Sequence, residues 1–372
     1  MLSTEELKRY QKQLVLADIG PEGQKALKRS KVLCVGAGGL GCPSLIYLTA
    51  TGVGELGIID PDKVDLTNLH RQVLFTEKDI GQSKVNVAKE KLTELNHNVS
   101  IKIFPFELTI KNSLEIFKNY DLVLDGTDNF EAKFLINDTA VKCEIPVVYA
   151  SLSQWEGQLA TFYAKSGGPC YRCIYPTPPK DMILNCEQAG ILCALAGVMG
   201  TLQAFEAIKV LLTKQFKYKN FDYSKLLHFD AMKMQFQTLK IEKDKNCPVC
   251  SLPTEKIVLK ETQSVLCQTG FDLAISVKEV QDKDLSQYVF IDIREPFEWK
   301  LGHIENAIHW PLSKLKSHEF PNLDNMEKII LYCQSGIRTK EAVQLFKDHG
   351  YTNVSYLKEG FSHWQGPVVT CS

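Results

Sequence analysis

An excess of charge of either sign is missing from this chain of 372 residues, in which 43 Lys and Arg face 44 Asp and Glu. The formal net charge of -1 argues against non-specific binding of nucleic acid, which needs a basic surface. The N-terminal segment MLSTEELKRYQKQ is polar, so no secretory signal peptide is expected. No apolar run approaches the length needed to cross a bilayer, and we therefore expect no membrane partner.

Cysteine is frequent, with twelve in the chain. Without a secretory signal, these cysteines favour free thiols, metal ligands and sulfur chemistry over a disulfide framework, and they indicate the cytoplasm. The length predicts two domains. Hydrophobic residues at 44% and charged residues at 23% are ordinary for a globular protein with a buried core.

The stretch from Lys31 to Gln72 carries the strongest motif. An apolar run, Val32 to Val35, ends at a glycine cluster, a helical pattern follows, and a second run, Leu56 to Ile59, leads to Asp60. This order predicts a nucleotide-binding βαβ unit in an α/β, Rossmann-like doubly wound domain, with Asp60 bonded to a ribose hydroxyl. The glycines let the backbone approach phosphate. They are Gly36, Gly38, Gly39 and Gly41.

The residues after Asp60 favour ATP over a dinucleotide. Arg71 and Lys84 place two cations near the phosphates, which suits a triphosphate that must lose pyrophosphate. A further strand ends at an acidic loop, where Asp128 is expected to hold the magnesium of Mg-ATP. Asp128 could equally cap the helix that starts at Phe130, and the two roles are compatible.

The segments GAGGLGCP, IIDPDKVDLTNLHRQ, GQSK and DGTDN resemble the ubiquitin-activating-enzyme-like family of ThiF/MoeB type, over about residues 5 to 255. The resemblance implies a homodimer that adenylates the C-terminal glycine of a ubiquitin-like sulfur-carrier protein ending in Gly-Gly. It also implies that Lys12, where the family usually has arginine, reaches the partner subunit's ATP site. The expected nucleotide-binding residues are the four glycines with Asp60, Thr67, Asn68, Arg71, Gln72, Lys84, Asp128, Asn129 and Lys12.

Two cysteine pairs have the spacing of a metal site. Cys170 and Cys173 form the first pair, and Cys247 and Cys250 form the second. Each two-residue gap lets both sulfurs meet one ion, and four thiolates suit tetrahedral zinc. Four protein ligands leave no open position, so the sequence predicts a structural zinc rather than a catalytic one.

Two more cysteines lie between these pairs. Cys186 is surrounded by polar residues and is expected to be accessible, whereas Cys193 falls on an apolar helical pattern from about Ile191 to Leu212 and is expected in the core. In the resembling family, the loop cysteine at the position of Cys186 links covalently to the activated carrier, as a thioester or an acyl disulfide. The alternative is an incidental exposed thiol.

Near the C-terminus, Cys333 follows a predicted strand, Lys328 to Tyr332, and precedes a helix. Backbone N–H groups and a helix dipole at such a turn stabilise a thiolate or a persulfide anion, and Arg338 can add charge. Four residues separate Cys333 from Arg338, which suits sulfur better than a full phosphate. An ion pair of Asp292 and Arg294 is expected to support the loop without taking part in chemistry.

Residues 265 to 366 resemble a single-domain rhodanese, a sulfurtransferase, through DIREPFEW, GHIENAI and LKEGFSHW. Glu359 departs from the glycine that many rhodaneses have there, which concerns packing more than chemistry. We therefore expect an adenylyltransferase domain at 1–252, a linker at 253–264 and a rhodanese-like domain at 265–372.

Together these features predict an enzyme that adenylates a sulfur carrier with ATP and then transfers sulfur from a Cys333 persulfide, giving a thiocarboxylate. The persulfide donor could be a cysteine desulfurase. Molybdopterin, thiamine and tRNA-thiolation pathways stay open, because the docking surface that selects the carrier cannot be read from the sequence. The alternatives are a non-catalytic carrier-binding module and an NAD-dependent oxidoreductase.

Overall fold

The computed structural model describes residues 1–177, 190–213, 221–260, 273–281, 285–324, 327–336 and 338–370. The chain forms two compact units, the first comprising the described residues up to 260 and the second those from 273 onward. Each unit has its own sheet and its own hydrophobic core.

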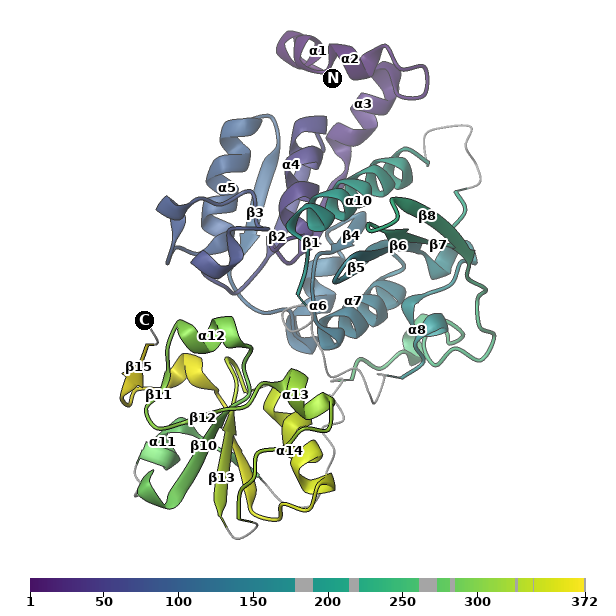
Figure 1. The fold of residues 1–372 in the computed structure, drawn as a ribbon. Coiled ribbons are helices and arrows are strands. Elements are labelled where there is room, and N and C mark those ends of the chain that lie inside the picture. Colours follow the sequence, from purple (N-terminus) through teal and green to yellow (C-terminus); the bar gives the residue numbers. More distant parts are fainter. Residues whose placement is uncertain are drawn as a thin grey trace. The chain divides into compact units, whose positions relative to one another are not determined.

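The first unit is built on an eight-stranded sheet of order β3-β2-β1-β4-β5-β6-β7-β8 (Figure 1). The strands from β3 to β5 are parallel, and those from β5 to β8 pair antiparallel. Their bounds are β1 (Lys31–Val35), β2 (Glu55–Ile59), β3 (Ser100–Phe104), β4 (Leu122–Asp125), β5 (Val147–Ser153), β6 (Glu156–Phe162), β7 (Lys225–Asp230) and β8 (Gln235–Lys240).

Strand order reverses between β1 and β4, because β2 and β3 lie on one side of β1 and β5 lies beyond β4. In a doubly wound sheet this reversal opens a crevice at the carboxyl ends of the two strands. Gly36 follows β1 directly and Gly126 follows β4. The predicted Rossmann-like architecture is confirmed, and it brings both predicted loops to one edge.

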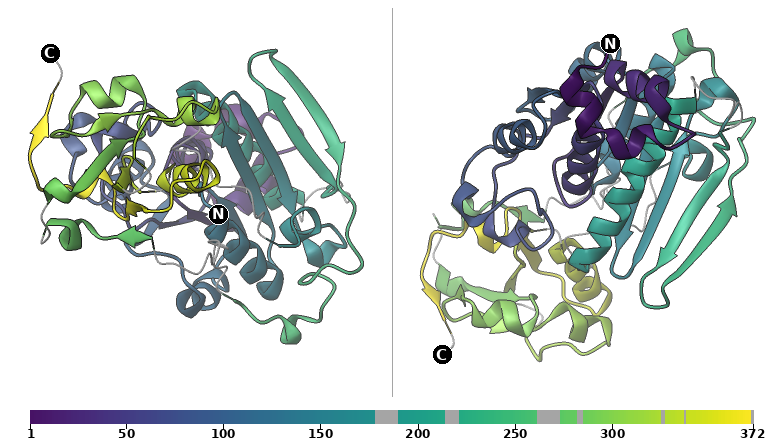
Figure 2. Two further views of the ribbon diagram at one scale, coloured as in Figure 1. Left: turned by 60° about the horizontal axis from the view of Figure 1, so that its bottom comes forward. Right: turned by 90° about the horizontal axis from the view of Figure 1, so that it is seen from above.

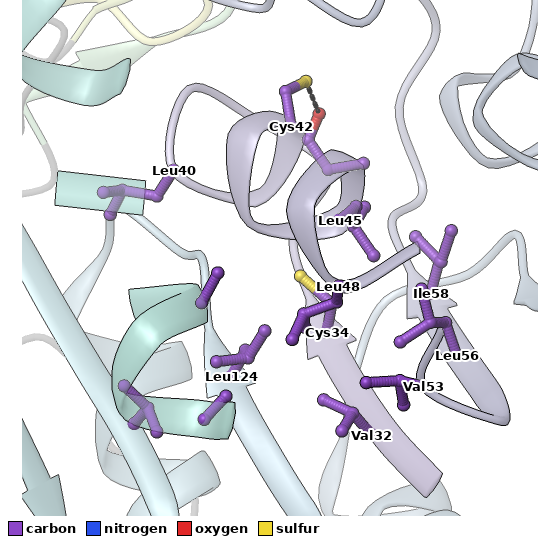
Figure 3. Close-up of a cluster of buried hydrophobic side chains, with 14 of the residues drawn as sticks. Val32, Cys34, Leu40, Cys42, Leu45, Leu48, Val53, Leu56, Ile58 and Leu124 are labelled. Carbon is purple, nitrogen blue, oxygen red and sulfur yellow. Dashed lines mark hydrogen bonds between the residues drawn. The ribbon is translucent and has the colours of Figure 1, made fainter. Parts of the chain in front are cut away.

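Helices cover both faces of this sheet. Alternate residues of β1 divide between two core clusters, with Val32 and Cys34 in one and Leu33 and Val35 in the other. Figure 3 shows the first cluster, where side chains of β1 and β2 meet those of α4. The helices of the unit are α1 (Thr4–Arg9), α2 (Gln11–Leu14), α3 (Gly20–Arg29), α4 (Gly41–Thr51), α5 (Lys84–Leu95), α6 (Ile110–Phe117), α7 (Phe130–Cys143), α8 (Tyr171–Ile174) and α10 (Cys193–Thr213).

Helix α10 corrects one expectation from the sequence. Its 21 residues are long and apolar enough to cross a membrane by length and composition, although no apolar run of that length was expected. The helix packs on α4, β5 and β6 and runs beside the N-terminal helices (Figure 2, right), and 56% of its most apolar window is buried. A core helix that is apolar nearly all round has this composition because it is covered on several sides.

The first part of the predicted linker packs on the first unit. Lys142, near the end of α7, donates from Nζ to the carbonyl oxygens of Thr254 (3.2 Å) and Ile257 (2.6 Å). These bonds hold a short 3₁₀ turn, η4 (Thr254–Lys256), and the Ile257 side chain is buried. Residues up to Lys260 therefore belong structurally to the first unit.

The second unit has a five-stranded parallel sheet of order β12-β10-β13-β14-β9. Its core lies on both faces, since Ile329 and Leu331 of β13 join one cluster and Ile330 and Tyr332 the other. The strands are β9 (Ala274–Ile275), β10 (Tyr288–Asp292), β12 (Ile308–His309), β13 (Lys328–Tyr332) and β14 (Val354–Leu357), with a separate pair β11 (His303–Ile304) and β15 (Val368–Val369). The helices are α11 (Val277–Gln281), α12 (Pro296–Lys300), α13 (Leu312–Lys316) and α14 (Arg338–Asp348).

Candidate functional site

A cavity of about 590 Å³ opens at the strand-order reversal of the first unit, and we call it the glycine-loop cavity. It is large enough for a nucleotide-sized ligand. Most residues predicted to bind nucleotide line it, although they come from five separate stretches of the chain. They are Gly36, Gly38, Gly39, Asp60, Asn68, Arg71, Gln72, Lys84, Asp128 and Asn129.

Three predicted residues do not line the cavity. Gly41 is buried at the start of α4, where a side chain would overlap the Gly36 carbonyl. The Thr67 hydroxyl donates to Asp65 Oδ1 (2.5 Å) as part of a short turn, η1 (Leu66–Asn68). Lys12 is exposed on α2 and lines no part of the cavity of its own chain.

The glycine loop approaches the β4 loop too closely for side chains. A Cβ on Gly36 would lie 2.8 Å from the Gly126 carbonyl oxygen, and a Cβ on Gly126 would lie 2.7 Å from the Gly36 oxygen. Gly36 also has φ +94°, a conformation that other residues rarely adopt. The two backbones therefore form the floor of the cavity, with no side chain between them.

Asp60 is fixed at the end of β2. Its Oδ2 accepts from the Ala37 amide (2.8 Å) and its Oδ1 from the Asp62 amide (2.9 Å). Burial raises the pKa of Asp60 above its ordinary value, although Lys84 and the two amides oppose that shift. A carboxylate held this rigidly at the second strand of a βαβ unit has the position expected for binding a ribose.

Lys84 begins α5, although the dipole disfavours a cation at that end of a helix. Its buried Nζ lies 2.8 Å from Asp62 Oδ2 and 4.0 Å from Asp60 Oδ1. The two carboxylates offset the positive charge of Lys84 at this helix end and hold its ammonium group at the cavity. Arg71 also lines the cavity, and one of its terminal nitrogens donates to the Thr67 carbonyl oxygen (3.3 Å).

The acidic loop after β4 carries two carboxylates, Asp125 and Asp128, that have different roles. Asp125 is buried and accepts from Lys133 Nζ (3.0 Å), so it is committed to a structural ion pair. Asn129, rather than Asp128, caps α7, because its Oδ1 accepts from the Ala132 amide (2.8 Å). The alternative of Asp128 as the helix cap is therefore wrong. Within the described ranges, Asp128 has no hydrogen bond or ion pair and stands exposed at the cavity.

Gln72 shows that the cavity suits a polar ligand. Its side chain is buried, yet its Oε1 has no hydrogen-bond partner in the described part of the chain. Unsatisfied buried acceptors are costly, and a bound donor removes that cost. Together with two cations and a free carboxylate, this acceptor fits a nucleotide that carries its own metal ion.

The two cysteine pairs converge as predicted. The sulfurs of Cys170 and Cys247 lie 3.5 Å apart, as do those of Cys173 and Cys250, and all four lie within 4.8 Å of one another. Sulfurs around a tetrahedral zinc stand roughly 3.8 Å apart, so this four-cysteine cluster could hold zinc. Hydrogen bonds among the four sulfurs lower the pKa of Cys173, lower that of Cys247 to about 7, and raise the pKa of Cys170 and of Cys250, so two of the four thiols favour the thiolate form that a metal needs.

The other two cysteines of this region have different outcomes. Cys193 is exposed at the first residue of α10, so the expectation that it packs in the core is wrong. Apolar residues lie around most of the surface of α10, so the sequence pattern does not reveal that Cys193 in the first turn is exposed. Cys186 lies outside the described residues.

In the second unit, Cys333 is buried at the start of a loop between β13 and α14, and we call residues 333–338 the Cys333 loop. The Phe361 amide donates to the Cys333 carbonyl (2.8 Å), and the Ser362 amide donates to that of Gln334 (3.0 Å). These bonds engage the carbonyl oxygens of Cys333 and Gln334. In the part of the chain that is described, the amides of Gln334, Ser335 and Gly336 donate to no backbone oxygen, so they are available to an anion.

Two side chains outside the Cys333 loop, Arg294 and Glu298, hold it in place. Arg294 pairs with the buried Asp292 (2.6 Å) and donates to Gln334 Oε1 (3.0 Å), which confirms the predicted supporting ion pair. Arg338 binds both oxygens of Glu298 (2.6 and 2.7 Å). Glu359, where many rhodaneses have glycine, accepts from the Val277 amide (3.0 Å) at the start of α11 and so makes a structural hydrogen bond.

A family model described as the ThiF family matches residues 10–249. The chain belongs to the ThiF family. A second model, the rhodanese-like domain, matches residues 276–367 of this ThiF-family protein. Both resemblances read from the sequence are therefore confirmed, and the chain combines the two domain types in one protein.

Curated relatives cover nearly the whole chain. The "Probable adenylyltransferase/sulfurtransferase MoeZ" of Mycobacterium tuberculosis is 37% identical, over 98% of this chain and 94% of its own. The "Adenylyltransferase and sulfurtransferase UBA4" of Meyerozyma guilliermondii is 37% identical, over 99% and 90%. The "Sulfur carrier protein adenylyltransferase" of Thermus thermophilus is 44% identical, over 68% and 94%. This ThiF-family protein is thus an enzyme with an adenylyltransferase unit and a sulfurtransferase unit.

Among solved structures, E. coli MccB has a TM-score of 0.57 and 23% identity, covering 67% of this chain and 73% of its own. At that identity the likeness shows the fold of the first unit. ATP use follows from the ThiF family, and the four-cysteine cluster is compatible with zinc.

Sequence reasoning missed three residues that the structure places in these sites: Asp62, Glu298 and Lys260. The pair Asp60-Pro-Asp62 offered a hint, because two carboxylates one residue apart at a strand end can share one cation. Glu298 lies within the segment DIREPFEW, but no sequence pattern indicates that it contacts Arg338. Lys260 lies in the predicted linker, where nothing in the pattern indicates a cavity.

Proposed function

We propose that the first unit adenylates the C-terminal glycine of a ubiquitin-like sulfur-carrier protein and that the second unit then converts it to a thiocarboxylate. The observation that carries this proposal is the glycine-loop cavity, which combines Lys84, Arg71 and a free Asp128 at the strand-order reversal. The name of the Thermus relative, a sulfur carrier protein adenylyltransferase, supports the choice of substrate. We propose domains at 1–252 and 265–372 joined by the segment 253–264, whose described part, up to Lys260, packs on the first unit.

In the first step, a carboxylate oxygen of the carrier attacks the α-phosphorus of ATP, and pyrophosphate leaves. Arg71 and Lys84 neutralise the phosphates as charge moves to the leaving group. Asp60 binds the ribose, and Asn68, Gln72 and the glycines position the nucleotide. Asp128, with Asn129 beside it, would hold magnesium, which offsets phosphate charge when bound.

In the second step, the terminal sulfur of a Cys333 persulfide attacks the acyl carbon, and AMP leaves. The product is an acyl disulfide on Cys333, and a second thiol must break its S–S bond to release the thiocarboxylate. Cys186 is the candidate for that thiol. Its attack would release the thiocarboxylate and leave a Cys186–Cys333 disulfide, which an external thiol must reduce before the next turnover. Alternatively, Cys186 holds the acyl group as a thioester before the sulfur attacks. The free amides of the Cys333 loop and Arg338 stabilise the persulfide anion.

Several partners complete the proposal. A homodimer would let Lys12 of one subunit serve the ATP site of the other. A cysteine desulfurase is a suitable persulfide donor, the cytoplasm is the proposed location, and the four-cysteine cluster would hold a structural zinc ion. Neither nucleic acid nor membrane enters the proposed reaction.

Mass spectrometry of a carrier protein ending in Gly-Gly tests both units at once. The carrier is incubated with the full chain, Mg-ATP and thiosulfate, beside the Cys333→Ala and Cys186→Ala variants. We expect a gain of about 16 Da, the exchange of oxygen for sulfur, that disappears with Cys333→Ala. An adenylate without sulfur would remove the role of the second unit. Failure to form either product on any carrier would contradict the activation proposal.

Two other functions make different predictions. An NAD-dependent oxidoreductase would bind NAD more tightly than ATP, but Lys84 and Arg71 in the cavity favour a triphosphate. A non-catalytic carrier-binding module would show neither ATP–pyrophosphate exchange nor thiosulfate turnover.

A further inference from the structure

The glycine-loop cavity has an unfavourable charge balance for a triphosphate. Among the described residues, its lining contains the carboxylates of Asp60, Asp62, Glu107, Asp128 and Glu131 but three cations, Arg71, Lys84 and Lys260. A nucleotide adds several further negative charges to this set. Each cation that faces the cavity therefore matters for binding and for the departure of pyrophosphate.

Two of the three cations already have partners. Lys84 is engaged by Asp62 at 2.8 Å and lies 4.0 Å from Asp60. Arg71 donates to a backbone oxygen at 3.3 Å. Lys260 differs from both, because within the described residues its ammonium group has no hydrogen bond or ion pair although it lines the cavity. A cation without an anion at this cavity is available to the substrate.

The backbone before Lys260 is held against α7. Lys142, at the C-terminal end of α7, binds the carbonyls of Thr254 and Ile257. The Ile257 side chain is 3% exposed and packs into the hydrophobic cluster that surrounds the four cysteines. Only two residues separate Ile257 from Lys260, so the lysine projects from an anchored segment.

The same helix connects this anchor to the cavity. Glu131 and Leu135, in the first half of α7, line the glycine-loop cavity, whereas Lys142 lies near its other end. The segment from Thr254 to Lys260 therefore passes from the cysteine-rich end of α7 to the cavity end. Its position explains how a residue far from the glycine motif in sequence comes to line the cavity.

We propose that Lys260 binds the phosphate chain of the nucleotide as a third cation of the glycine-loop cavity, contributed by the segment that follows the second cysteine pair. This inference rests on the proposed use of the cavity for ATP. The side chain is exposed, so its charge acts through partly screened contacts and raises affinity for phosphate rather than performing bond chemistry.

Calorimetric titration of the full chain with Mg-ATP and, separately, with adenosine tests the proposal. Lys260→Ala is expected to weaken ATP binding about 3- to 10-fold, the size of one partly exposed charge contact, and to leave adenosine binding unchanged. Lys260→Arg keeps the charge and is expected to restore most of the affinity. Lys256→Ala is the matched control, because Lys256 is an exposed lysine of the same segment that does not line the cavity.

Each outcome decides the matter. Equal ATP affinity of Lys260→Ala and the wild type would overturn the assignment, as would an equal loss in Lys256→Ala. A parallel loss of adenosine binding would show that the lysine shapes the pocket and does not contact phosphate. If the wild type binds no ATP, the proposed function itself fails, and that result is distinct from a specific failure of Lys260.

Discussion

Both terminal nitrogens of Arg338 donate to Glu298, one to Oε2 at 2.7 Å and the other to Oε1 at 2.6 Å. The arginine that was expected to add charge to the Cys333 loop is therefore held by a carboxylate from α12, a different element. Burial would raise the pKa of Glu298, but the hydrogen bonds and charge of Arg338 lower it below its ordinary value of 4.5. Glu298 is thus a positioning residue for the charge beside Cys333.

This pair predicts a defined pH dependence. A carboxyl group whose folded pKa is lowered stabilises the fold above its unfolded pKa, here 4.5, and that contribution is lost as pH falls through the folded pKa. Glu298→Gln is expected to lower the free energy of unfolding of the second unit by about 1–3 kcal/mol at pH 7. Calorimetric melting from pH 7 to 3.5 measures the effect.

The variant should also lose part of its thiosulfate-to-cyanide sulfur transfer at pH 7, because Arg338 is no longer fixed. Below pH 4.5 the wild type is expected to approach the stability of Glu298→Gln. Parallel melting curves across the whole pH range would show that the ion pair contributes nothing to the fold.

Asp128 and Asn129 are expected to separate chemistry from stability. Asp128→Asn removes the free carboxylate at the cavity, so ATP–pyrophosphate exchange should fall at least about 100-fold while the melting temperature stays unchanged. Asn129→Ala removes the cap of α7 and should cost about 1 kcal/mol of stability. A loss of stability in Asp128→Asn, or none in Asn129→Ala, would contradict the division of roles seen after β4.

The elements of the fold were largely predictable because local patterns determine them. The predicted apolar run Val32 to Val35 lies in β1, and the apolar runs before Asp60 and Cys333 are β2 and β13. Period and turn chemistry carry this information along the chain. The two ligand pairs of the four-cysteine cluster were also readable, because their spacing is a local feature of the sequence.

The residues that were missed depend on contacts between distant segments. Glu298 and Arg338 are 40 residues apart in the sequence, and the folding of the second unit brings their side chains into contact. Cys193 was misjudged because hydropathy cannot tell which side of an apolar helix turn remains uncovered. The cap of α7 went to Asn129 rather than its neighbour Asp128 because the choice depends on backbone angles at one residue.

The floor of the glycine-loop cavity predicts a contrast between two glycines. A Cβ on Gly126 would lie 2.7 Å from a backbone oxygen that cannot move independently, whereas the nearest atom to a Cβ on Gly38 is Gln72 Nε2 at 3.8 Å. Gly126→Ala is therefore expected to destabilise the first unit by about 2–4 kcal/mol. Gly38→Ala should keep the wild-type melting temperature and weaken only ATP binding, measured by calorimetry. Equal stability of both variants would contradict the close backbone approach.

The four-cysteine cluster predicts one zinc ion per chain, measurable by atomic emission on protein purified without chelators. Cys250→Ser should lose the metal and lower the melting temperature of the first unit, because structural zinc contributes directly to folding. Cys193→Ser is the control, since this cysteine is exposed at the start of α10 and outside the cluster, and it should retain one zinc. Full zinc content in Cys250→Ser would show that the metal lies elsewhere.

Removal of the metal should also weaken nucleotide binding in the glycine-loop cavity. Ile257 packs into the hydrophobic cluster around the four cysteines, three residues before Lys260 lines the cavity. Loss of zinc frees the anchored segment, so the chelated protein should bind Mg-ATP about as weakly as Lys260→Ala does, and combining the two changes should add little. If the losses instead add fully, then the cluster affects the cavity by another route, and the segment after the second cysteine pair does not connect them.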